Sequence, residues 1–169
     1  MNTSTPDILV VGGAGYIGSH VVKALRDAGR QPVVFDNLST GLRENLFPEI
    51  PFIHGDLLIP EQVRAAMRGI RSVVHLAALK AAGDSMLEPE RYALHNLNGT
   101  VNLLHAAGTA GVRHFVFSSS AAVYGEPQYL PLDENHPTEP ANFYGQTKLQ
   151  IEMLLSLSLI HISEPTRQP

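Results

Sequence analysis

The chain has 169 residues, of which 44% are hydrophobic and 17% charged, so it can form one domain with a proper core. Its net charge is −4 and its 12 lysines and arginines are spread along the sequence, which disfavours nucleic-acid and membrane partners because both need concentrated positive charge. The absence of cysteine excludes disulfides, thiolate metal ligands and cysteine nucleophiles, and we expect no metal site.

Short apolar runs alternate with helical patterns from the beginning of the chain. Five apolar runs predict strands, at 8–11, 32–36, 52–54, 72–76 and 114–118. Helical spacing predicts helices at 16–28, 61–67 and 88–107, and a further helix that starts near Tyr144. A proline-rich polar stretch at 127–140 predicts an ordered surface loop. This alternation predicts an α/β fold built on a doubly wound parallel sheet, the Rossmann fold.

Three glycines separate the first strand from the first helix, in the pattern Gly12-x-x-Gly15-x-x-Gly18. This position between strand and helix indicates a dinucleotide site. We expect the first glycine to permit a tight turn, the second to let the backbone approach a pyrophosphate, and the third to let the helix pack against the sheet. Unpaired N–H groups at the helix start would then face the phosphates. The alternative is a glycine-rich turn without a ligand.

Two aspartates follow predicted strands. Asp36 ends the second strand, where a carboxylate can accept hydrogen bonds from the adenosine ribose and would repel a 2′-phosphate, which favours NAD over NADP. Asp56, with Leu57, follows the third strand, where a carboxylate could hold the adenine amino group. Ordinary strand-end and turn aspartates are the alternatives.

Tyr144 and Lys148 lie four residues apart on a predicted helix and therefore share a face. A nearby ammonium favours the phenolate form of tyrosine, which makes the phenol a usable base near neutral pH. Ser120 comes just after the fifth strand, at the edge where ligands bind in open α/β folds, and its hydroxyl could hydrogen-bond a reacting oxygen. The tyrosine–lysine pair alone could be an exposed helix pair, but its place after the glycine turn, Asp36 and Ser120 favours catalysis.

From about Ile8 to Leu155 the sequence resembles the UDP-hexose 4-epimerases of the extended short-chain dehydrogenase/reductase family. The resemblance rests on GGAGYIGSH at 12–20, DNLSTG at 36–41, HLAALKAAGDS at 75–85, HNLNGT at 95–100, FSSSAAVYG at 117–125 and YGQTK at 144–148. It implies an isomerase that interconverts UDP-glucose and UDP-galactose with NAD, through a transient 4-keto sugar. Tyr144 would take the proton of the sugar 4-hydroxyl while the hydride passes to NAD and later returns to the opposite face.

The resemblance also assigns residues to the cofactor and the substrate. Ser120, Tyr144 and Lys148 match the catalytic positions, and the first two would contact the substrate. Lys80 follows HLAAL, as is typical of the epimerases, although a surface lysine is the alternative. The implied NAD contacts are Gly12, Gly15, Tyr16, Ile17, Gly18, Asp36, Asn37, Leu38, Ser39, Thr40, Gly41, Asp56, Leu57, Leu76, Ala77, Ala78, Leu79, Lys80, Asn96, Ser120, Tyr144 and Lys148.

Ala121 and Ala122 stand where related dehydratases have an acidic pair. Elimination of water needs an additional acid and base, so the two alanines favour epimerisation. Another NAD-dependent nucleotide-sugar epimerase or decarboxylase stays open, as does a non-catalytic NAD-binding module.

The resemblance ends at Leu155. The residues LSLIHISEPTR at 157–167 resemble the translation of a sequencing-library adapter, so we expect a non-native tail at 156–169, with a genuine divergent tail as the alternative. We therefore expect residues 1–155 to be an NAD-binding domain that is truncated before its last strands and the C-terminal substrate lobe, and inactive alone. The resemblance implies a cytoplasmic enzyme that is a homodimer at full length.

Overall fold

The structure, a computed structural model, describes residues 6–163, with side chains as far as Ser158. The chain divides into two compact units. We call residues 6–78 with 98–118 the sheet unit, and residues 79–97 with 119–163 the helical unit. The tail expected at 156–169 lies partly on the last helix, and residues 164–169 are outside the described residues.

The sheet unit contains five parallel strands in the order β3-β2-β1-β4-β5. Their bounds are β1 Ile8–Val11, β2 Pro32–Asp36, β3 Phe52–His54, β4 Ser72–His75 and β5 His114–Phe117. All five strands were predicted, and so was their parallel arrangement. The first strand lies in the middle, because the chain runs outward to β3 in one direction and then to β5 in the other.

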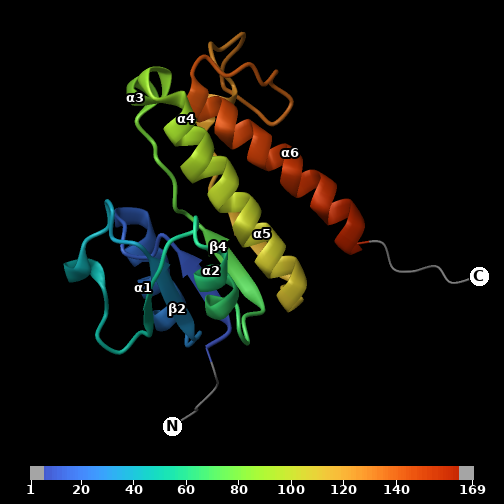
Figure 1. Cartoon of the computed structure of the whole chain (residues 1–169). Helices are drawn as coiled ribbons and strands as arrows, with labels where there is room; N and C mark the ends of the chain where they lie inside the picture. Colours follow the sequence, from blue (N-terminus) through green and yellow to red (C-terminus); the bar gives the residue numbers. More distant parts are fainter. Residues whose placement is uncertain (1–5, 164–169) are drawn as a thin grey trace, which may run out of the picture. The chain divides into compact units, whose positions relative to one another are not determined.

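Helices cover both faces of this sheet (Figure 1). Alternate residues of a strand point to opposite faces. Leu9 therefore packs in a core with α2 (Pro60–Ala66) and α5 (Gly99–Ala110), whereas Val10 packs with α1 (Tyr16–Asp27) on the other face. This two-sided burial is why the strand sequences are continuous apolar runs, and it confirms the doubly wound α/β fold.

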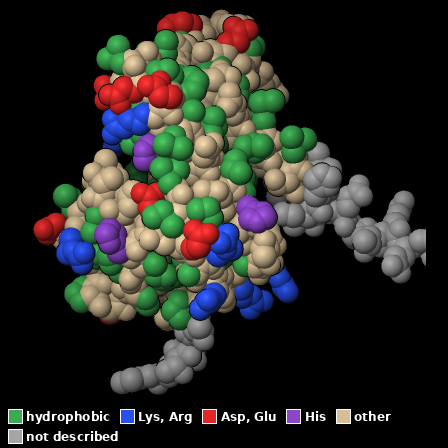
Figure 2. Space-filling model, viewed as in Figure 1, with side chains coloured by type: hydrophobic (Ala, Val, Ile, Leu, Met, Phe, Trp, Pro, Cys, Tyr) green, Lys and Arg blue, Asp and Glu red, His purple; other side chains and the backbone are tan. Residues whose placement is uncertain are grey.

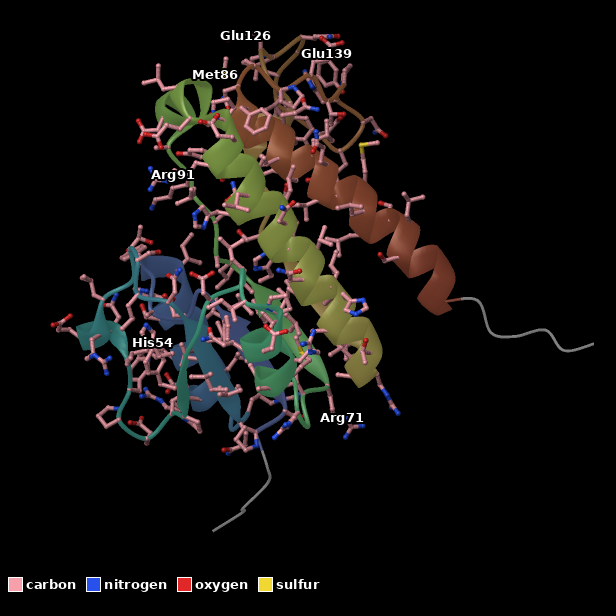
Figure 3. All side chains as sticks on the ribbon, in the orientation of Figure 1. His54, Arg71, Met86, Arg91, Glu126 and Glu139 are labelled. Atoms are coloured by element: carbon pink, nitrogen blue, oxygen red, sulfur yellow. The ribbon has the colours of Figure 1, made fainter. Side chains whose placement is uncertain are left out.

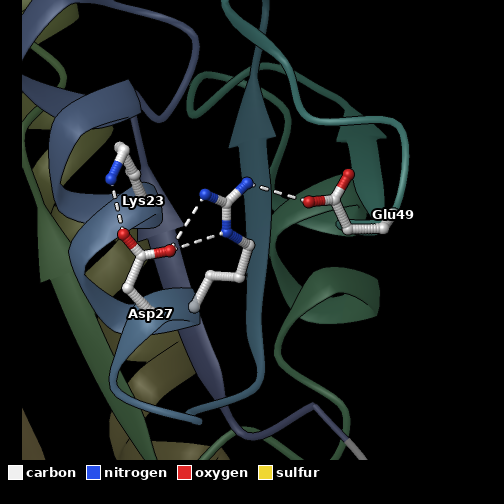
Figure 4. A network of polar contacts seen from close by, with 4 residues as sticks. Lys23, Asp27 and Glu49 are labelled. Atoms are coloured by element: carbon white, nitrogen blue, oxygen red, sulfur yellow. Dashed lines mark hydrogen bonds and ion pairs between the residues drawn. The ribbon is translucent and has the colours of Figure 1, made fainter.

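An exposed polar network joins α1 to the segment before β3 (Figure 4). Lys23 Nζ lies 2.5 Å from Asp27 Oδ2, and Arg26 lies 2.9 Å from both Asp27 and Glu49. Hydrogen bonds from Lys23 and Arg26 lower the pKa of Asp27. Because these side chains are largely solvated, the network contributes little to the stability of the fold.

The prediction of one continuous α-helix at 88–107 is wrong. The segment contains α4 (Pro89–Tyr92), a π-helical stretch η2 (Ala93–Asn98) and then α5, which runs on to Ala110. A π turn closes its hydrogen bonds one residue further along the chain than an α turn, so it shifts the helical face by one position. Apolar spacing does not reveal such a shift.

The buried face of the helical segment that follows Pro89 also differs from the face that the spacing of its apolar residues indicates. Leu94 and Val101 are both 46% exposed, whereas Thr100 and Leu103 are almost fully buried. Small residues on the buried side, Gly99, Ala106 and Ala107, allow the helix to approach its neighbours closely. Leu94 and Val101 are left outside, whereas Leu103 is the large residue that packs into the core.

The helical unit consists of short helices around α6 (Phe143–Ser163). The short helices are α3 (Ala82–Leu87), α4 and the 3-10 turn η3 (Ala121–Val123), and each of them contacts α6. The sequence did not predict α3, because six residues are too few to display a helical period.

The loop predicted at 127–140 is ordered around His136, which is 3% exposed. The backbone N–H of Gln128 donates to His136 Nε2 over 2.9 Å, so the ring proton is on Nδ1, which donates to Pro137 O over 2.8 Å. Tyr124 and Tyr129 pack against the imidazole. A buried histidine with both nitrogens engaged therefore holds the loop together.

Candidate functional site

The glycine turn between β1 and α1 is closely packed. Gly12 has a φ of +83°, a conformation that favours glycine, and a Cβ there would lie 2.7 Å from the backbone nitrogen of Ala77. A Cβ on Gly18 would lie 2.1 Å from the carbonyl oxygen of Gly12. These two contacts agree with the roles predicted for the first and third glycines, the tight turn and the close approach of the helix.

Gly15 is the N-cap residue of α1. In the described structure no side chain caps this helix, and its first turn holds no acidic residue. Tyr16 and Ile17, at the helix start, are 79% and 60% exposed. The start of α1 thus presents backbone N–H donors and the positive end of the helix dipole, and exposed apolar surface lies beside them. This combination suits the phosphate of an organic phosphate ester.

Asp36 is buried where β2 ends, and both its carboxylate oxygens accept backbone hydrogen bonds. The N–H of Ala14 donates to Oδ2 over 3.0 Å, and the N–H of Leu38 donates to Oδ1 over 2.8 Å. Each carboxylate oxygen has a second lone pair, so the pair of oxygens can still accept from a sugar hydroxyl. The aspartate therefore both shapes the turn and remains available to a ligand.

The segment after Asp36 folds over the glycine turn. Leu38 has a φ of +58°, which is uncommon for a residue with a side chain and marks local strain. A Cβ on Gly41 would lie 2.9 Å from the Cβ of Ala14, and Asn45 Nδ2 donates to Ala14 O over 2.8 Å. Ser39 and Thr40, between these contacts, are exposed.

Asp56 lies beside this segment. Its Oδ2 accepts from Asn37 Nδ2 over 3.0 Å, and its Oδ1 accepts from the N–H of Leu58 over 2.8 Å. The remaining predicted cofactor residues of the sheet unit, Leu57, Leu76, Ala77 and Ala78, are all partly buried. The sheet unit thus brings together the glycine turn, Asp36, Asn37 and Asp56.

Tyr144 and Lys148 share one face of α6, as predicted. Lys148 Nζ lies 5.8 Å from the centroid of the Tyr144 ring, and Lys148 is only 3% exposed. Burial lowers the pKa of Lys148 to about 8. A buried ammonium close to a phenol ring is an arrangement suited to proton transfer by tyrosine.

The start of α6 is held by three side chains. Asn142 Oδ1 accepts from the N–H of Gly145 over 2.8 Å, as an N-cap residue does. The N–H of Tyr144 donates to Ser85 Oγ over 3.0 Å, and Ser85 is fully buried. The N–H of Phe143 donates to the sulfur of Met86, a residue labelled in Figure 3. Helix α3 thus fixes the backbone of Tyr144.

Ser120 begins the turn η3, where its Oγ accepts from the N–H of Ala122 over 3.1 Å. The first turn of α6 lies against this turn. A Cβ on Gly145 would be 2.5 Å from the carbonyl oxygen of Ala122. Glycine at position 145 therefore allows the segments of Ser120 and Tyr144 to approach each other.

Asn96 is buried, and its amide is engaged with the protein. It accepts from the N–H of Leu79 over 2.9 Å and donates to Leu79 O over 3.0 Å and to Thr147 Oγ1 over 3.2 Å. The hydroxyl of Thr147 in turn donates to Tyr144 O over 2.7 Å. Asn96 thus links the Leu79 backbone to the helix of Tyr144, while the neighbouring Lys80 is exposed.

Sequence reasoning missed several residues that position these groups. Gly145 and Ser85 lie inside the motifs YGQTK and HLAALKAAGDS, but their roles are visible only as contacts between distant segments. Glu152, one turn after Lys148, accepts a hydrogen bond from Ser119, next to Ser120. The only sign of this role in the sequence is that Glu152 lies four residues after Lys148, on the same side of the helix. Among the side chains described, those of residues 6–158, no group of His, Asp or Glu could hold a metal ion, and no helix in the described part of the chain could span a membrane.

Comparisons with known proteins agree with this arrangement. The model of the NAD dependent epimerase/dehydratase family matches residues 8–157. UDP-glucose 4-epimerase from Streptomyces lividans is 44% identical over 151 residues, which cover 88% of this chain and 46% of that protein. The Mus musculus UDP-glucose 4-epimerase is 43% identical over 164 residues, which cover 88% of this chain and 47% of that protein.

Solved structures show the same similarity. UDP-glucose 4-epimerase from Thermus thermophilus, in complex with NAD, has a TM-score of 0.88 to this chain at 38% identity, covering 92% of this chain and 51% of that one. The chain spans about half the length of the curated relatives it matches. With the fold, the glycine turn and the family match in agreement, the chain belongs to the NAD dependent epimerase/dehydratase family.

Proposed function

We propose that the protein to which this chain belongs epimerises C4 of a UDP-hexose with bound NAD, interconverting UDP-glucose and UDP-galactose. The observation that carries the proposal is the buried Lys148, whose Nζ lies 5.8 Å from the Tyr144 ring centroid. A binding module without catalysis has no need of a buried ammonium beside a phenol, because burying a charge costs free energy. The similarity to UDP-glucose 4-epimerases supports the same reaction.

The glycine turn fits NAD. The space in front of Gly12 and Gly18 is too narrow for any Cβ, which is typical of a turn kept short so that backbone donors reach a phosphate. We propose that the first turn of α1 holds the pyrophosphate, that Asp36 accepts from the adenosine ribose, and that Asp56 lies near the adenine. The buried carboxylate of Asp36 favours NAD over NADP because it would repel a 2′-phosphate. When bound, NAD would supply a reversible hydride acceptor.

The residues of the helical unit would move the proton. Tyr144 would accept the proton of the sugar 4-hydroxyl through its phenolate oxygen, while the hydrogen on C4 leaves as a hydride to the acceptor that NAD would supply. The two losses together would give a transient 4-keto sugar, and Tyr144 would return the proton when the hydride returns to the opposite face of the turned sugar. Lys148 would stabilise that phenolate. Ser120, oriented by its bond from Ala122, would donate to the same sugar oxygen.

The remaining NAD contacts implied by the sequence stay part of this proposal. They are Gly15, Tyr16, Ile17, Asn37, Leu38, Ser39, Thr40, Gly41, Leu57, Leu76, Ala77, Ala78, Leu79, Lys80 and Asn96. Asn96 would act by holding the backbone at Leu79, since its amide is engaged there. We further propose a cytoplasmic location, a homodimeric whole protein, an NAD-binding domain at 1–155 and a non-native tail at 156–169. The nucleotide sequence of the gene beyond codon 155 tests the last point.

The experiment uses a chimera, because the chain spans about half the length of its relatives. Residues 1–155 are joined to the remaining part of the Streptomyces lividans UDP-glucose 4-epimerase, and conversion of UDP-galactose to UDP-glucose is measured. Tyr144→Phe should lower turnover by at least about a hundredfold while NAD stays bound. The control, Tyr129→Phe, removes the hydroxyl of an exposed tyrosine in the same unit and should leave turnover unchanged. Equal turnover in the two variants would refute the role of Tyr144.

A further inference from the structure

Four arginines that are spread along the sequence come together at the edge of the sheet where the strands begin. The glycine turn lies at the other edge, where β1 ends. Arg64, Arg68, Arg71 and Arg113 line one hollow of about 530 Å³ in the sheet unit. They are a third of the 12 basic residues in a chain whose net charge is −4. The sequence-based expectation that positive charge is not concentrated is therefore wrong for this edge. Figure 2 shows basic side chains gathered there, and Figure 3 shows Arg71 near the end of α5.

The backbone holds the two arginine-bearing turns side by side. The carbonyl oxygen of Arg71 accepts from the N–H of Arg113 over 2.9 Å and from the N–H of His114 over 3.3 Å. Gly69 and Gly111, with φ values of +76° and +72°, make both turns tight. The spacing of these arginines is thus set by hydrogen-bonded main chain, which reduces the ordering cost of binding a ligand between them.

The positive charge in the hollow is only partly neutralised by the protein. Arg64 pairs with Glu61 at 2.7 Å, whereas Arg68, Arg71 and Arg113 have no ion pair within the described residues. Helices α2 and α5 end at this hollow, and each helix end contributes roughly half a negative charge. The carboxylate and the two helix ends together leave a surplus of about two positive charges. Solvated arginines at helix ends would not need to converge on one hollow.

The floor of the hollow is apolar. Met67, Ile70 and Ala106, each no more than 4% exposed, line the hollow together with the arginines. Its volume lies within the range of small-molecule sites. Guanidinium groups match the geometry of phosphate oxygens with paired N–H donors.

We propose that this hollow, which we call the arginine site, binds a small anion with two or more phosphate charges, such as a diphosphate or a nucleotide-sized phosphate ester. The site lies at the edge of the sheet where the strands begin, whereas the glycine turn follows the end of β1. It is therefore a second anion site in the same unit. The compact outline of the cluster favours a small anion over a nucleic acid, which needs a basic stripe along its backbone.

The test measures binding of inorganic pyrophosphate to the 169-residue chain by calorimetry, at two salt concentrations. Because the glycine turn could also take pyrophosphate, the variants identify the site. Arg68→Gln with Arg113→Gln should weaken one pyrophosphate-binding event by about tenfold or more and leave any binding at the glycine turn unchanged, since each substitution removes a charge-assisted bond from the arginine site. Arg30→Gln, an exposed arginine after α1, is the control of equal charge change and should leave the affinity unchanged.

Three outcomes would overturn the proposal. They are no binding of pyrophosphate by the parent chain, equal affinity in the double variant, or an equal loss in the Arg30 control, which would mean unspecific attraction. A short single-stranded RNA that binds more tightly than pyrophosphate, and loses affinity in the double variant, would assign the hollow to nucleic acid instead. The single variants Arg68→Gln and Arg113→Gln, checked by thermal unfolding, answer the question if the double variant does not fold. An intermediate loss in each single variant supports the proposal.

Discussion

The backbone N–H of Ala14 donates to the buried Oδ2 of Asp36 over 3.0 Å, so the glycine turn is tied to the end of β2. The second oxygen of Asp36 accepts from Leu38 at the beginning of the next loop. One carboxylate thereby orients both segments that flank the proposed ribose site. Asp36 therefore has a structural role beside the ribose-binding role that we propose for it.

Asp36→Ala should weaken NAD binding by about ten- to hundredfold, because hydrogen bonds to a charged group are worth about 1.5–3 kcal/mol. NADP binding should fall less, since the repulsion of a 2′-phosphate is removed together with the ribose contact. Calorimetric titration of both dinucleotides checks the ratio. Glu44→Gln removes an exposed negative charge of the same unit and serves as the control. An unchanged preference for NAD in Asp36→Ala would show that Asp36 does not select the cofactor.

Gly18→Ala should destabilise the sheet unit and abolish NAD binding. The new Cβ would lie 2.1 Å from Gly12 O and 2.7 Å from Gly13 Cα, both of them backbone atoms that cannot move aside easily. Overpacking of this kind costs about 1–3 kcal/mol. Gly108→Ala in α5 is the matched control, because its Cβ would meet nothing within 4 Å, and it should stabilise the chain by about 0.5–1 kcal/mol. Denaturant unfolding of both variants separates the two effects, and similar losses would contradict the packing argument.

Lys148→Met should change how stability depends on pH. Burial lowers the pKa of Lys148 from 10.5 to about 8 in the folded chain, so between these values the unfolded chain binds more protons. The free energy of unfolding contributed by Lys148 therefore rises with pH across this window, by up to roughly 3 kcal/mol, and the full penalty of burial applies below it. The difference between parent and variant, measured by denaturant unfolding from pH 7 to 10.5, should show this slope. Lys23→Met, at an exposed lysine, is the control, and an equal slope there would contradict the assignment.

Gly145→Ala should lower turnover in the chimera by about a hundredfold, because a displacement of about 1 Å at a reacting group has an effect of that size. The added Cβ would lie 2.5 Å from Ala122 O, which forces the first turn of α6 away from the turn that begins at Ser120. NAD affinity should be retained. Gly83→Ala in α3 adds the same methyl group where nothing lies within 4 Å and should leave turnover unaffected. Normal turnover in Gly145→Ala would show that this close approach is not needed for catalysis.

Local patterns in the sequence were sufficient for the strands and the glycine turn of the sheet unit. Short apolar runs predicted all five strands, and β1 and β2, which are buried at every residue, have no polar side. The three glycines predicted the turn at Gly12, because a positive φ and contacts as short as 2.1 Å exclude a side chain. The face shared by Tyr144 and Lys148 followed from helical geometry alone. Each of these features depends on residues close together in the chain.

The tertiary structure decided what depends on distant residues. The helix predicted at 88–107 contains a π segment, and its buried side carries small residues, because the shape of its neighbours determines which side fits. Gly145 matters through the carbonyl oxygen of Ala122, and Asn96 through the backbone of Leu79. The arginine site combines Arg64, Arg68 and Arg71 with Arg113, from a turn that enters a different strand. No local pattern contains these relations, since each arises only when packing of the core brings separate segments together.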